Sequence, residues 1–251
     1  MVTQAEVHWI ELDVVDSTNS HLINAYHTGA VHGVVAVVAH AQTAGRGRAG
    51  RVWQARRGAS LCLSLGLPLT GPVPALLPLC TGLAIAHTLQ DLGVTVALKW
   101  PNDLLLAGGK LGGVLCEAFQ AQGQTHVVVG VGINLDNPLD SDLPAGALPV
   151  ACLHAQPAVI RQTPVAWARL LVPALLARLT PCLAGQTAGV AAEFARWDAW
   201  RGMPLQVEDA GQVLMHGVGM GINAQGAYLL DTSTGLKAVH AGDISLRVQH
   251  G

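Results

Sequence analysis

A segment rich in glycine and arginine, Gly45-Arg46-Gly47-Arg48-Ala49-Gly50-Arg51, is well suited to hold an anion. Glycine lets the backbone approach a ligand closely, and arginine offers planar pairs of N–H donors to a phosphate or carboxylate. The glycines also match the G-x-G-x-x-G dinucleotide fingerprint. We reject that interpretation, because no apolar helix follows and no acidic residue lies about 20 positions further on. Two interpretations remain, a ligand-binding loop and a solvated basic loop.

A second candidate motif is Lys99-Trp100-Pro101-Asn102-Asp103, which joins a cation, an aromatic ring and a rigid turn. Asp103 offers oxygen ligands that would suit Mg²⁺. The alternative is a β-turn in which Asn102 and Asp103 only satisfy backbone groups. These residues alone leave both interpretations open.

Two further polar residues interrupt apolar segments. Lys110 has glycines on both sides in Gly109-Lys110-Leu111-Gly112-Gly113, an arrangement that suits a lysine neutralising charge on a transferred phosphoryl group. The alternative for Lys110 is a solubilising charge at a turn. Asn134, within residues 130–135, must find hydrogen-bond partners either in the core or in a ligand. The sequence contains no P-loop, HExxH or GxSxG motif.

Alternating strands and helices would position these residues. A helix is expected to begin after Asp16-Ser17-Thr18-Asn19 and to end by Gly29. Other helices are predicted over residues 72–92, 163–183 and 187–200, and a loop over 137–162. Trp197 and Trp200 would anchor the last helix to the next domain. Strands are predicted over residues 7–15, 34–40, 60–67, 94–99, 103–107, 110–120 and 126–135.

From about residue 202 the pattern changes to short strands separated by turns, over residues 205–208, 212–219, 227–231, 235–239 and 244–248. We therefore predict an α+β fold with two domains. Residues 1–201 would form a catalytic domain with a mixed β-sheet packed with helices. Residues 202–251 would form a small C-terminal Src-homology-like β-barrel.

Composition excludes several classes of protein. The 251 residues carry a net charge of −2, whereas a dedicated nucleic-acid binder is usually broadly basic. The longest apolar stretches fall short of the roughly 20 residues of a membrane span, and no secretory signal is recognisable. Five cysteines without a CxxC pair indicate buried thiols in a reducing cytoplasm. The eleven histidines are scattered and define no metal cluster.

Five motifs taken in order resemble those of the biotin–protein ligases. They are Asp16–Asn19, Gln42-Thr43-Ala44 with the arginine–glycine segment and Val52-Trp53, Lys99–Asp103, residues 108–117, and residues 130–135. The resemblance implies an enzyme that makes biotinyl-AMP from biotin and ATP and passes biotin to a lysine of a biotin carboxyl carrier protein. Residues 219–247 also resemble the small C-terminal β-barrel of that family.

The resemblance also implies roles for single residues. Lys110, Arg46 and Arg48 would be catalytic, and Trp53 would pack on the adenine. Asp103 would bind Mg²⁺, with Glu117 as the alternative ligand. The residues implied for biotin are Ser17, Thr18, Asn19, Gln42, Gly45, Arg46, Lys110, Gly112 and Gly113. Those implied for the nucleotide are Arg48, Arg51, Trp53, Lys99, Asn102 and Asn134.

Two departures from the family pattern stand out. Ala49 replaces an arginine found in many relatives, so a weaker grip on the adenylate is expected. The first strand begins by Val7, which leaves no room for the DNA-binding domain of family members that double as repressors; we expect a ligase without operator binding. Relatives occur as monomers and as dimers, so homodimerisation stays open.

Two other functions compete with the biotin ligase. A lipoate–protein ligase would share the fold, but the paired arginines and the Lys99–Asp103 motif favour biotin. A non-enzymatic biotin or nucleotide sensor would not need Lys110 and the arginine pair aimed at a transition state.

Overall fold

The computed structural model describes residues 6–137, 147–209, 212–242 and 245–248. The larger of its two sheets has seven strands in the order β1-β2-β3-β7-β6-β5-β4. β1 and β2 run parallel, and the other neighbours run antiparallel, which confirms the predicted mixed sheet. The strands are β1 (His8–Val15), β2 (Val35–Gln42), β3 (Ser60–Leu69), β4 (Ala97–Lys99), β5 (Asp103–Leu106), β6 (Gly109–Ala121) and β7 (Gln124–Asn134).

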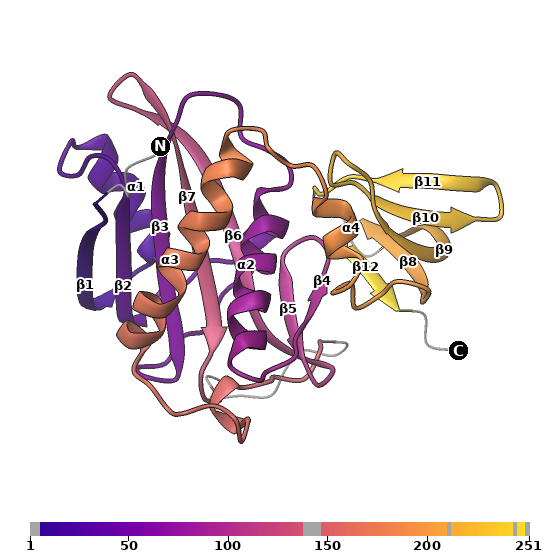
Figure 1. Ribbon diagram of the computed structural model, residues 1–251, viewed down its shortest axis with the longest axis horizontal. Helices are drawn as coiled ribbons and strands as arrows, with labels where there is room; N and C mark the ends of the chain where they lie inside the picture. The colour runs from indigo at the N-terminus through magenta and orange to yellow at the C-terminus, as the bar shows by residue number, and fades with distance from the viewer. Residues whose placement is uncertain (1–5, 138–146, 210–211, 243–244, 249–251) are drawn as a thin grey trace.

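Helices cover both faces of this sheet. α2 (Leu77–Asp91) and α3 (Pro164–Leu183) lie together on one face, and α1 (Thr18–His27) lies on the other (Figure 1). β2 is buried on both of its faces, which explains why its sequence is a continuous apolar run. Ala36 and Val38 belong to the core beneath α2 and α3, whereas Val35 and Val37 belong to the core beneath α1. A strand buried on both faces needs an apolar side chain at every position.

α3 is a core helix despite a membrane-like composition. Among the described residues it is the one helix long and apolar enough to cross a membrane, with 20 residues and a mean hydropathy of 1.3. Its Trp167, Leu171, Leu175 and Leu179 are buried in the core shared with α2 and the sheet. This packing accounts for its composition.

The second sheet contains five antiparallel strands in the order β11-β10-β9-β8-β12. They are β8 (Pro204–Asp209), β9 (Gln212–Ile222), β10 (Tyr228–Thr232), β11 (Gly235–Val239) and β12 (Ser245–Val248). Leu205, Tyr228 and Leu230 join the core of the larger sheet. Ile244, expected to open the last strand, lies outside the described residues, as does part of the predicted loop over residues 137–162. The division into domains at residue 201 stays a prediction.

The helix predicted over residues 187–200 was wrong in its extent. Only α4 (Val190–Phe194) is helical. Beyond it the backbone pairs with β4, because Leu98 N donates to Trp197 O at 2.7 Å and Ala199 N donates to Leu98 O at 3.0 Å. Trp197 and Trp200 therefore lie after the helix and not on it. The ring of Trp197 packs edge-on against His87, and Trp200 lies beneath the Lys99 ammonium group.

Candidate active site

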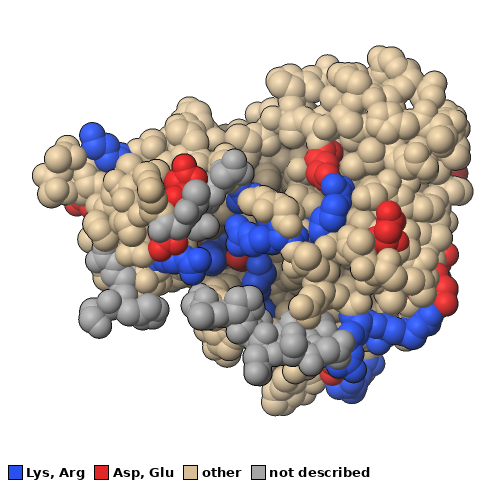
Figure 2. Space-filling view, turned by 180° about the vertical axis from the view of Figure 1, so that it is seen from behind, with Lys and Arg blue, Asp and Glu red and all other residues tan. Residues whose placement is uncertain are grey.

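A cavity of about 160 Å³ lies where the larger sheet, the start of α1 and the second sheet meet. Figure 2 shows Lys and Arg side chains gathered around the hollowed part of this face. The lining contains five basic side chains, and Asp103 is the only carboxylate among the described lining residues. The basic residues are Arg46, Arg48, Arg51, Lys99 and Lys110. The site is thus suited to a small anionic ligand.

One end of the cavity is a cluster of neutral hydrogen-bonding groups. Ser17 caps α1 through its side-chain oxygen, which places Thr18 and Asn19 in the first turn of the helix. Gln42, at the end of β2, accepts hydrogen bonds from the Thr18 amide at 2.8 Å and from the Thr18 hydroxyl at 3.0 Å. The hydroxyl of Ser64 on β3 lies 2.7 Å from the Thr18 hydroxyl and 2.5 Å from Asn19 Oδ1. These side chains fix one another in place.

The arginine loop, defined as residues 45–51, forms a tight turn across the cavity. Gly47 N donates to Arg51 O at 2.7 Å, and Trp53 N donates to Gly45 O at 2.9 Å. A Cβ atom on Gly45 would lie 2.3 Å from Trp53 O, so this position requires glycine. At the tip, Ala49 has the left-handed backbone conformation, with φ 52°.

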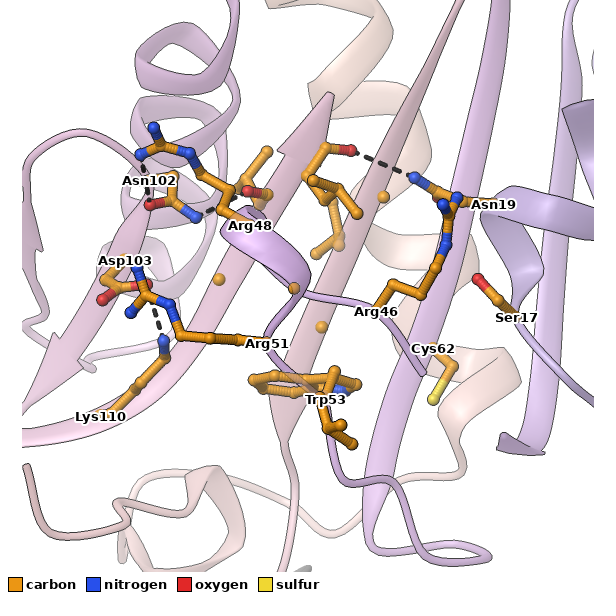
Figure 3. A pocket seen from close by; sticks show the side chains of 18 of the residues that line it. Ser17, Asn19, Arg46, Arg48, Arg51, Trp53, Cys62, Asn102, Asp103 and Lys110 are labelled. Atoms are coloured by element: carbon orange, nitrogen blue, oxygen red, sulfur yellow. Dashed lines mark hydrogen bonds and ion pairs between the residues drawn. The ribbon is translucent and has the colours of Figure 1, made fainter. Parts of the chain in front are cut away.

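The arginines of the loop point in different directions. Figure 3 shows Arg46 on the side of Ser17 and Asn19, and Arg48 and Arg51 on the side of Asn102. Arg48 donates to Asn102 Oδ1 at 3.4 Å and to Gly242 O, beyond β11, at 2.8 Å. The loop therefore lies between the two ends of the cavity and also touches the C-terminal segment.

Trp53 forms the floor beneath the loop. Its indole ring lies flat against Gly132 of β7, where a Cβ atom would come within 2.5 Å of Trp53 Cε2. The indole Nε1 is buried and has no hydrogen-bond partner among the described residues. The middle of the cavity is therefore an aromatic surface with an unused donor.

The other end of the cavity carries two lysines that share one carboxylate. Lys110 Nζ lies 2.8 Å from Asp103 Oδ1, and Lys99 Nζ lies 3.5 Å from Asp103 Oδ2. Burial lowers the pKa of Lys99, and the nearby charge of Lys110 lowers it further, while Asp103 opposes both effects. The Trp100–Pro101 bond is cis, and Asn102 Nδ2 donates to Val114 O at 2.8 Å. These contacts hold the turn before β5 against β6.

The structure brings most of the predicted site residues together. The predicted residues in the cavity lining are Ser17, Thr18, Asn19, Gln42, Arg46, Arg48, Arg51, Trp53, Lys99, Asn102, Asp103, Lys110 and Gly113. Gly45, Gly112 and Asn134 are not among the residues that line the cavity. Asn134 Nδ2 donates to Lys110 O at 3.1 Å, and a Cβ on Gly112 would lie 2.4 Å from Gly132 O.

Sequence reasoning missed Ser64 and Cys62. Ser64 and Cys62 stand in an apolar strand and match no motif, and only the pairing of β3 with β2 and β7 brings them to the site. Glu117 was considered only as an alternative to Asp103 for binding Mg²⁺. Its carboxylate contacts Arg46 and Asn19.

Comparison with known proteins identifies relatives of this chain. The model of the Biotin/lipoate A/B protein ligase family matches residues 11–134. The bifunctional ligase/repressor BirA of Escherichia coli K12 is 34% identical over 243 residues, which are 94% of this chain and 73% of that protein. The biotin–[acetyl-CoA-carboxylase] ligase of Paracoccus denitrificans is 31% identical over 91% of this chain and 96% of its own length. The structure of biotin protein ligase from Aquifex aeolicus in complex with biotin and ATP has a TM-score of 0.78 and 25% identity, covering 96% of this chain and 99% of that one.

The fold and the cationic cavity define a protein ligase of the biotin/lipoate class, whose model extends from β1 to the end of β7. The Escherichia coli and Paracoccus denitrificans relatives named above are both more than 30% identical to this chain, which covers 73% and 96% of their lengths. They narrow the class to the biotin ligases. The chain belongs to the biotin protein ligase family.

Proposed function

We propose that this chain activates biotin with ATP to biotinyl-5′-AMP, releases pyrophosphate, and transfers biotin to a lysine of a biotin carboxyl carrier protein. The observation that carries the proposal is the division of the cavity. Neutral hydrogen-bonding groups around Thr18 and Gln42 form one end, with Arg46 on the same side, and Arg48, Arg51, Lys99 and Lys110 lie toward the other end. A ligand with an uncharged polar ring and an anionic reacting end matches this division.

The neutral end is suited to the ureido ring of biotin. Ser17, Thr18, Asn19 and Gln42 are buried or half-buried, and the hydrogen bonds from Thr18 to Gln42 and from Ser64 to Thr18 and Asn19 hold donors and acceptors in fixed positions. Gly113 on β6 lines the cavity without a side chain, and Gly112 lies next to it in the sheet, so the valeryl chain would run along the strand toward Lys110. Gly45 would hold the arginine loop close enough for Arg46 to reach the carboxylate.

The cationic end is suited to the nucleotide phosphates. Arg48, Arg51 and Lys99 would bind the phosphates, Trp53 would pack on the adenine, and Asn102 would contact the nucleotide. Asn134 would act indirectly, through its hydrogen bond to the Lys110 carbonyl.

The reaction then proceeds in two nucleophilic displacement steps. A carboxylate oxygen of biotin attacks the α-phosphorus of ATP, and the bond to pyrophosphate breaks. Arg46, Arg48 and Lys110 would offset the negative charge that develops on the phosphoryl oxygens. The amine of the carrier lysine next attacks the acyl carbon, the bond to AMP breaks, and the amine loses a proton. The arginine loop would exclude water from the mixed anhydride.

The residues of the site fit a Mg²⁺ ion only when the phosphates of ATP supply further ligands. The described residues contain no group of three His, Cys, Asp or Glu side chains that could hold a metal ion. Both oxygens of Asp103 face lysines. Mg²⁺ commonly takes one or two carboxylates and completes its shell with phosphates and water. Asp103 would therefore supply one ligand, and the ion would offset phosphate charge.

The cellular setting belongs to the same proposal. We place the reaction in the cytoplasm, where biotin, ATP and the carrier meet, and assign no membrane or nucleic-acid partner to these residues. A homodimer remains one of the two expected oligomeric states.

The function is tested with radiolabelled biotin, Mg-ATP and a purified carrier domain. We expect a covalent label on the carrier, with labelled lipoate as the competing acid. Transfer of lipoate alone, or of neither acid, contradicts the proposal.

A single substitution tests the role of Lys110. Lys110→Ala should keep the fold, because Lys99 still pairs with Asp103, and should slow biotin-dependent pyrophosphate release by roughly a hundredfold or more. Lys237→Ala is the matched control, since Lys237 is exposed on β11. An unchanged rate for Lys110→Ala would remove the residue from catalysis.

A further inference from the structure

Lys99 is a buried cation that stands among other cations at the nucleotide end of the cavity. Its side chain is 20% exposed, against 35% for Lys110. Burial lowers the pKa of Lys99, and the charges of Lys110 and Arg51 lower it further. The Asp103 carboxylate opposes these effects without cancelling them, because its Oδ1 lies 2.8 Å from Lys110 Nζ and only its Oδ2, at 3.5 Å, faces Lys99 Nζ. A cation in such surroundings needs a second stabilising partner.

The indole ring of Trp200 supplies that partner. Lys99 Nζ lies 4.8 Å from the centroid of the ring, inside the roughly 6 Å over which an aromatic face attracts a cation. Trp200 is only 8% exposed, so little water screens the contact. Trp200 is not among the described residues that line the cavity. It can therefore act on a ligand only through Lys99.

Backbone pairing fixes the ring in this place. Two backbone hydrogen bonds join Leu98, the neighbour of Lys99 on β4, to the segment that precedes Trp200. Trp200 N then donates to Asp198 Oδ1 at 3.0 Å, and Asp198 Oδ2 accepts from the Tyr228 hydroxyl on β10 at 2.9 Å. The ring is thus held between the larger sheet and the second sheet, next to the end of β4.

An aromatic face stabilises the ammonium group without adding negative charge to the cavity. A second carboxylate in the place of Trp200 would accept the N–H donors of Lys99 and repel an incoming anion. The ring leaves the lining with five cations and one carboxylate among the described residues. The donors of Lys99 are therefore left to the ligand, while the ring offsets part of the cost of keeping the cation buried.

We infer that Trp200 is a positioning residue, whose ring face holds the Lys99 ammonium group where the phosphates of the nucleotide bind. The inference rests on the proposed function for the identity of the anion, a phosphate group of ATP. Loss of the ring should weaken nucleotide binding, because Lys99 loses its place. Binding of biotin should be unchanged, because its ureido ring would lie at the other end of the cavity, around Thr18 and Gln42.

The first arm of the test needs no ligand. The complete ligand-free chain is treated with acetic anhydride, and peptide mass spectrometry follows the acetylation of Lys99, with the exposed Lys237 as internal reference. Trp200→Leu should raise the rate at Lys99 several-fold, because the ring no longer covers the amine. Trp197→Leu is the matched control, since it removes a second buried indole from the same segment, one that packs on His87. An unchanged rate at Lys99 in Trp200→Leu, or an equal rise in Trp197→Leu, overturns the inference, whatever the enzyme acts on.

The second arm measures the kinetics of biotin-dependent pyrophosphate release. Trp200→Leu should raise the KM for ATP about threefold to tenfold, the range of a partly buried cation–π contact. The kcat and the KM for biotin should stay within about twofold of the wild type, as should all three constants in Trp197→Leu. In the Lys99→Gln background, Trp200→Leu should add nothing. An unchanged KM for ATP, a fall in kcat alone, or full additivity with Lys99→Gln overturns the inference.

A conservative substitution separates positioning from support of the fold. Trp200→Phe keeps a weaker aromatic face, so it should restore most of the wild-type KM and of the protection of Lys99. Circular dichroism checks folding, and if Trp200→Leu does not fold, Trp200→Phe against Trp197→Phe decides by the same two measurements. Wild-type chain that releases no pyrophosphate with biotin refutes the proposed function. The acetylation arm then still decides whether Trp200 holds Lys99.

Discussion

At the scale of single residues, glycines shape this site as much as the charged side chains do. Gly130 makes room for the Asn19 amide, and Gly132 makes room for the Trp53 indole. Both stand on β7, in the middle of the larger sheet, where apolar side chains are otherwise the rule. Their lack of a side chain brings polar and aromatic groups from other segments onto the strand.

Gly132→Ala should displace the indole of Trp53. The new methyl group would lie 2.5 Å from Trp53 Cε2, a distance that forces the ring to move. We expect biotin-dependent pyrophosphate release to fall by roughly tenfold to a hundredfold, because the floor of the cavity shifts. Trp53→Ala should cause little further loss in the Gly132→Ala background. Gly71→Ala, at a position with open space, is the control, and full additivity of the two changes would contradict the argument.

The ionisation of the Cys62 thiol, in the lining of the cavity, reports on the electrostatic environment there. Burial raises the pKa of its thiol to about 12. Because pH 8 lies about four units below this pKa, only about one Cys62 thiol in ten thousand should be ionised. A free cysteine thiol has an ordinary pKa of about 8.5 and would be ionised far more often. The neutral thiol would not attack the mixed anhydride formed beside it.

Iodoacetamide should therefore leave Cys62 nearly unmodified in the native chain at pH 8. Because the thiolate is the reacting form, its modification rate should rise about tenfold for each pH unit until the fold is lost. Peptide mass spectrometry measures the rate, and denatured protein provides the fully reactive reference. A modification rate in the native chain equal to that in the denatured chain would contradict the raised pKa of the Cys62 thiol.

Site residues that stand in unusual local sequence were easier to predict than those in ordinary strands. Arg46, Arg48 and Lys110 stand among glycines, which is an unusual local context and therefore a strong signal. Ser64 stands in an ordinary apolar strand, and its importance arises from hydrogen bonds to residues more than 40 positions away. Such contacts depend on strand register, which local sequence does not encode.

At the scale of elements, the short β4–β5 hairpin connects the cavity to the second sheet. Trp100, between these strands, is 2% exposed, and its Nε1 donates to Gly226 O at 2.9 Å. Its ring also lies 5.7 Å from that of Tyr228 on β10. The residues that follow, Asn102 and Asp103, face the cavity. The second sheet therefore helps to position the nucleotide end of the site.

Trp100→Phe should weaken this connection. The change removes the Nε1 donor, leaves Gly226 O without this partner, and opens space in the core. We expect the free energy of unfolding to fall by about 1–3 kcal/mol. Urea unfolding measures the loss. Trp9→Phe, on the edge strand β1, is the matched control and should cost less because Trp9 is only partly buried. An equal loss from both substitutions would contradict a special role for Trp100.

Prediction of the elements succeeded where hydrophobic pattern and local structure agree. β1, β3 and α3 lie within about two residues of their predicted bounds, a typical uncertainty for helix ends. α2 starts at Leu77, later than predicted from residue 72, because the prolines before it lie in a turn region. The segment after α4 failed for another reason. Its composition favours helix, but its backbone pairs with β4, and tertiary pairing outweighs local propensity.

At the scale of the whole molecule, the helical layer is tied together by one charged network. Glu193 on α4 accepts from Arg178 on α3 and from His87 on α2, the latter at 2.8 Å. Three helices from distant parts of the sequence thus meet at one carboxylate. The same layer covers the sheet on the face opposite α1 (Figure 1). Loss of this contact should therefore loosen the support beneath the larger sheet.

Glu193→Gln should destabilise the chain in a pH-dependent manner. Burial alone would raise the pKa of Glu193, but the hydrogen bonds from Arg178 and His87 outweigh it and hold the pKa below the ordinary 4.5. A carboxyl group with a lowered folded pKa stabilises the fold above its unfolded pKa, and this stabilisation is lost as the pH falls through the folded pKa. At neutral pH we expect the variant to lose about 1–3 kcal/mol of unfolding free energy, since the side chain is 22% exposed and bonds to charged partners. The difference from wild type should begin to shrink as the pH falls below about 4.5, the ordinary pKa at which the carboxyl group of the unfolded chain takes up a proton, and it should be lost as the pH falls through the lower pKa of the folded state. Urea unfolding at neutral pH and at pH 4 measures both values, with the exposed Glu11→Gln as control. A difference that stays constant with pH would show that the shape of the side chain, and not its charge, joins the three helices.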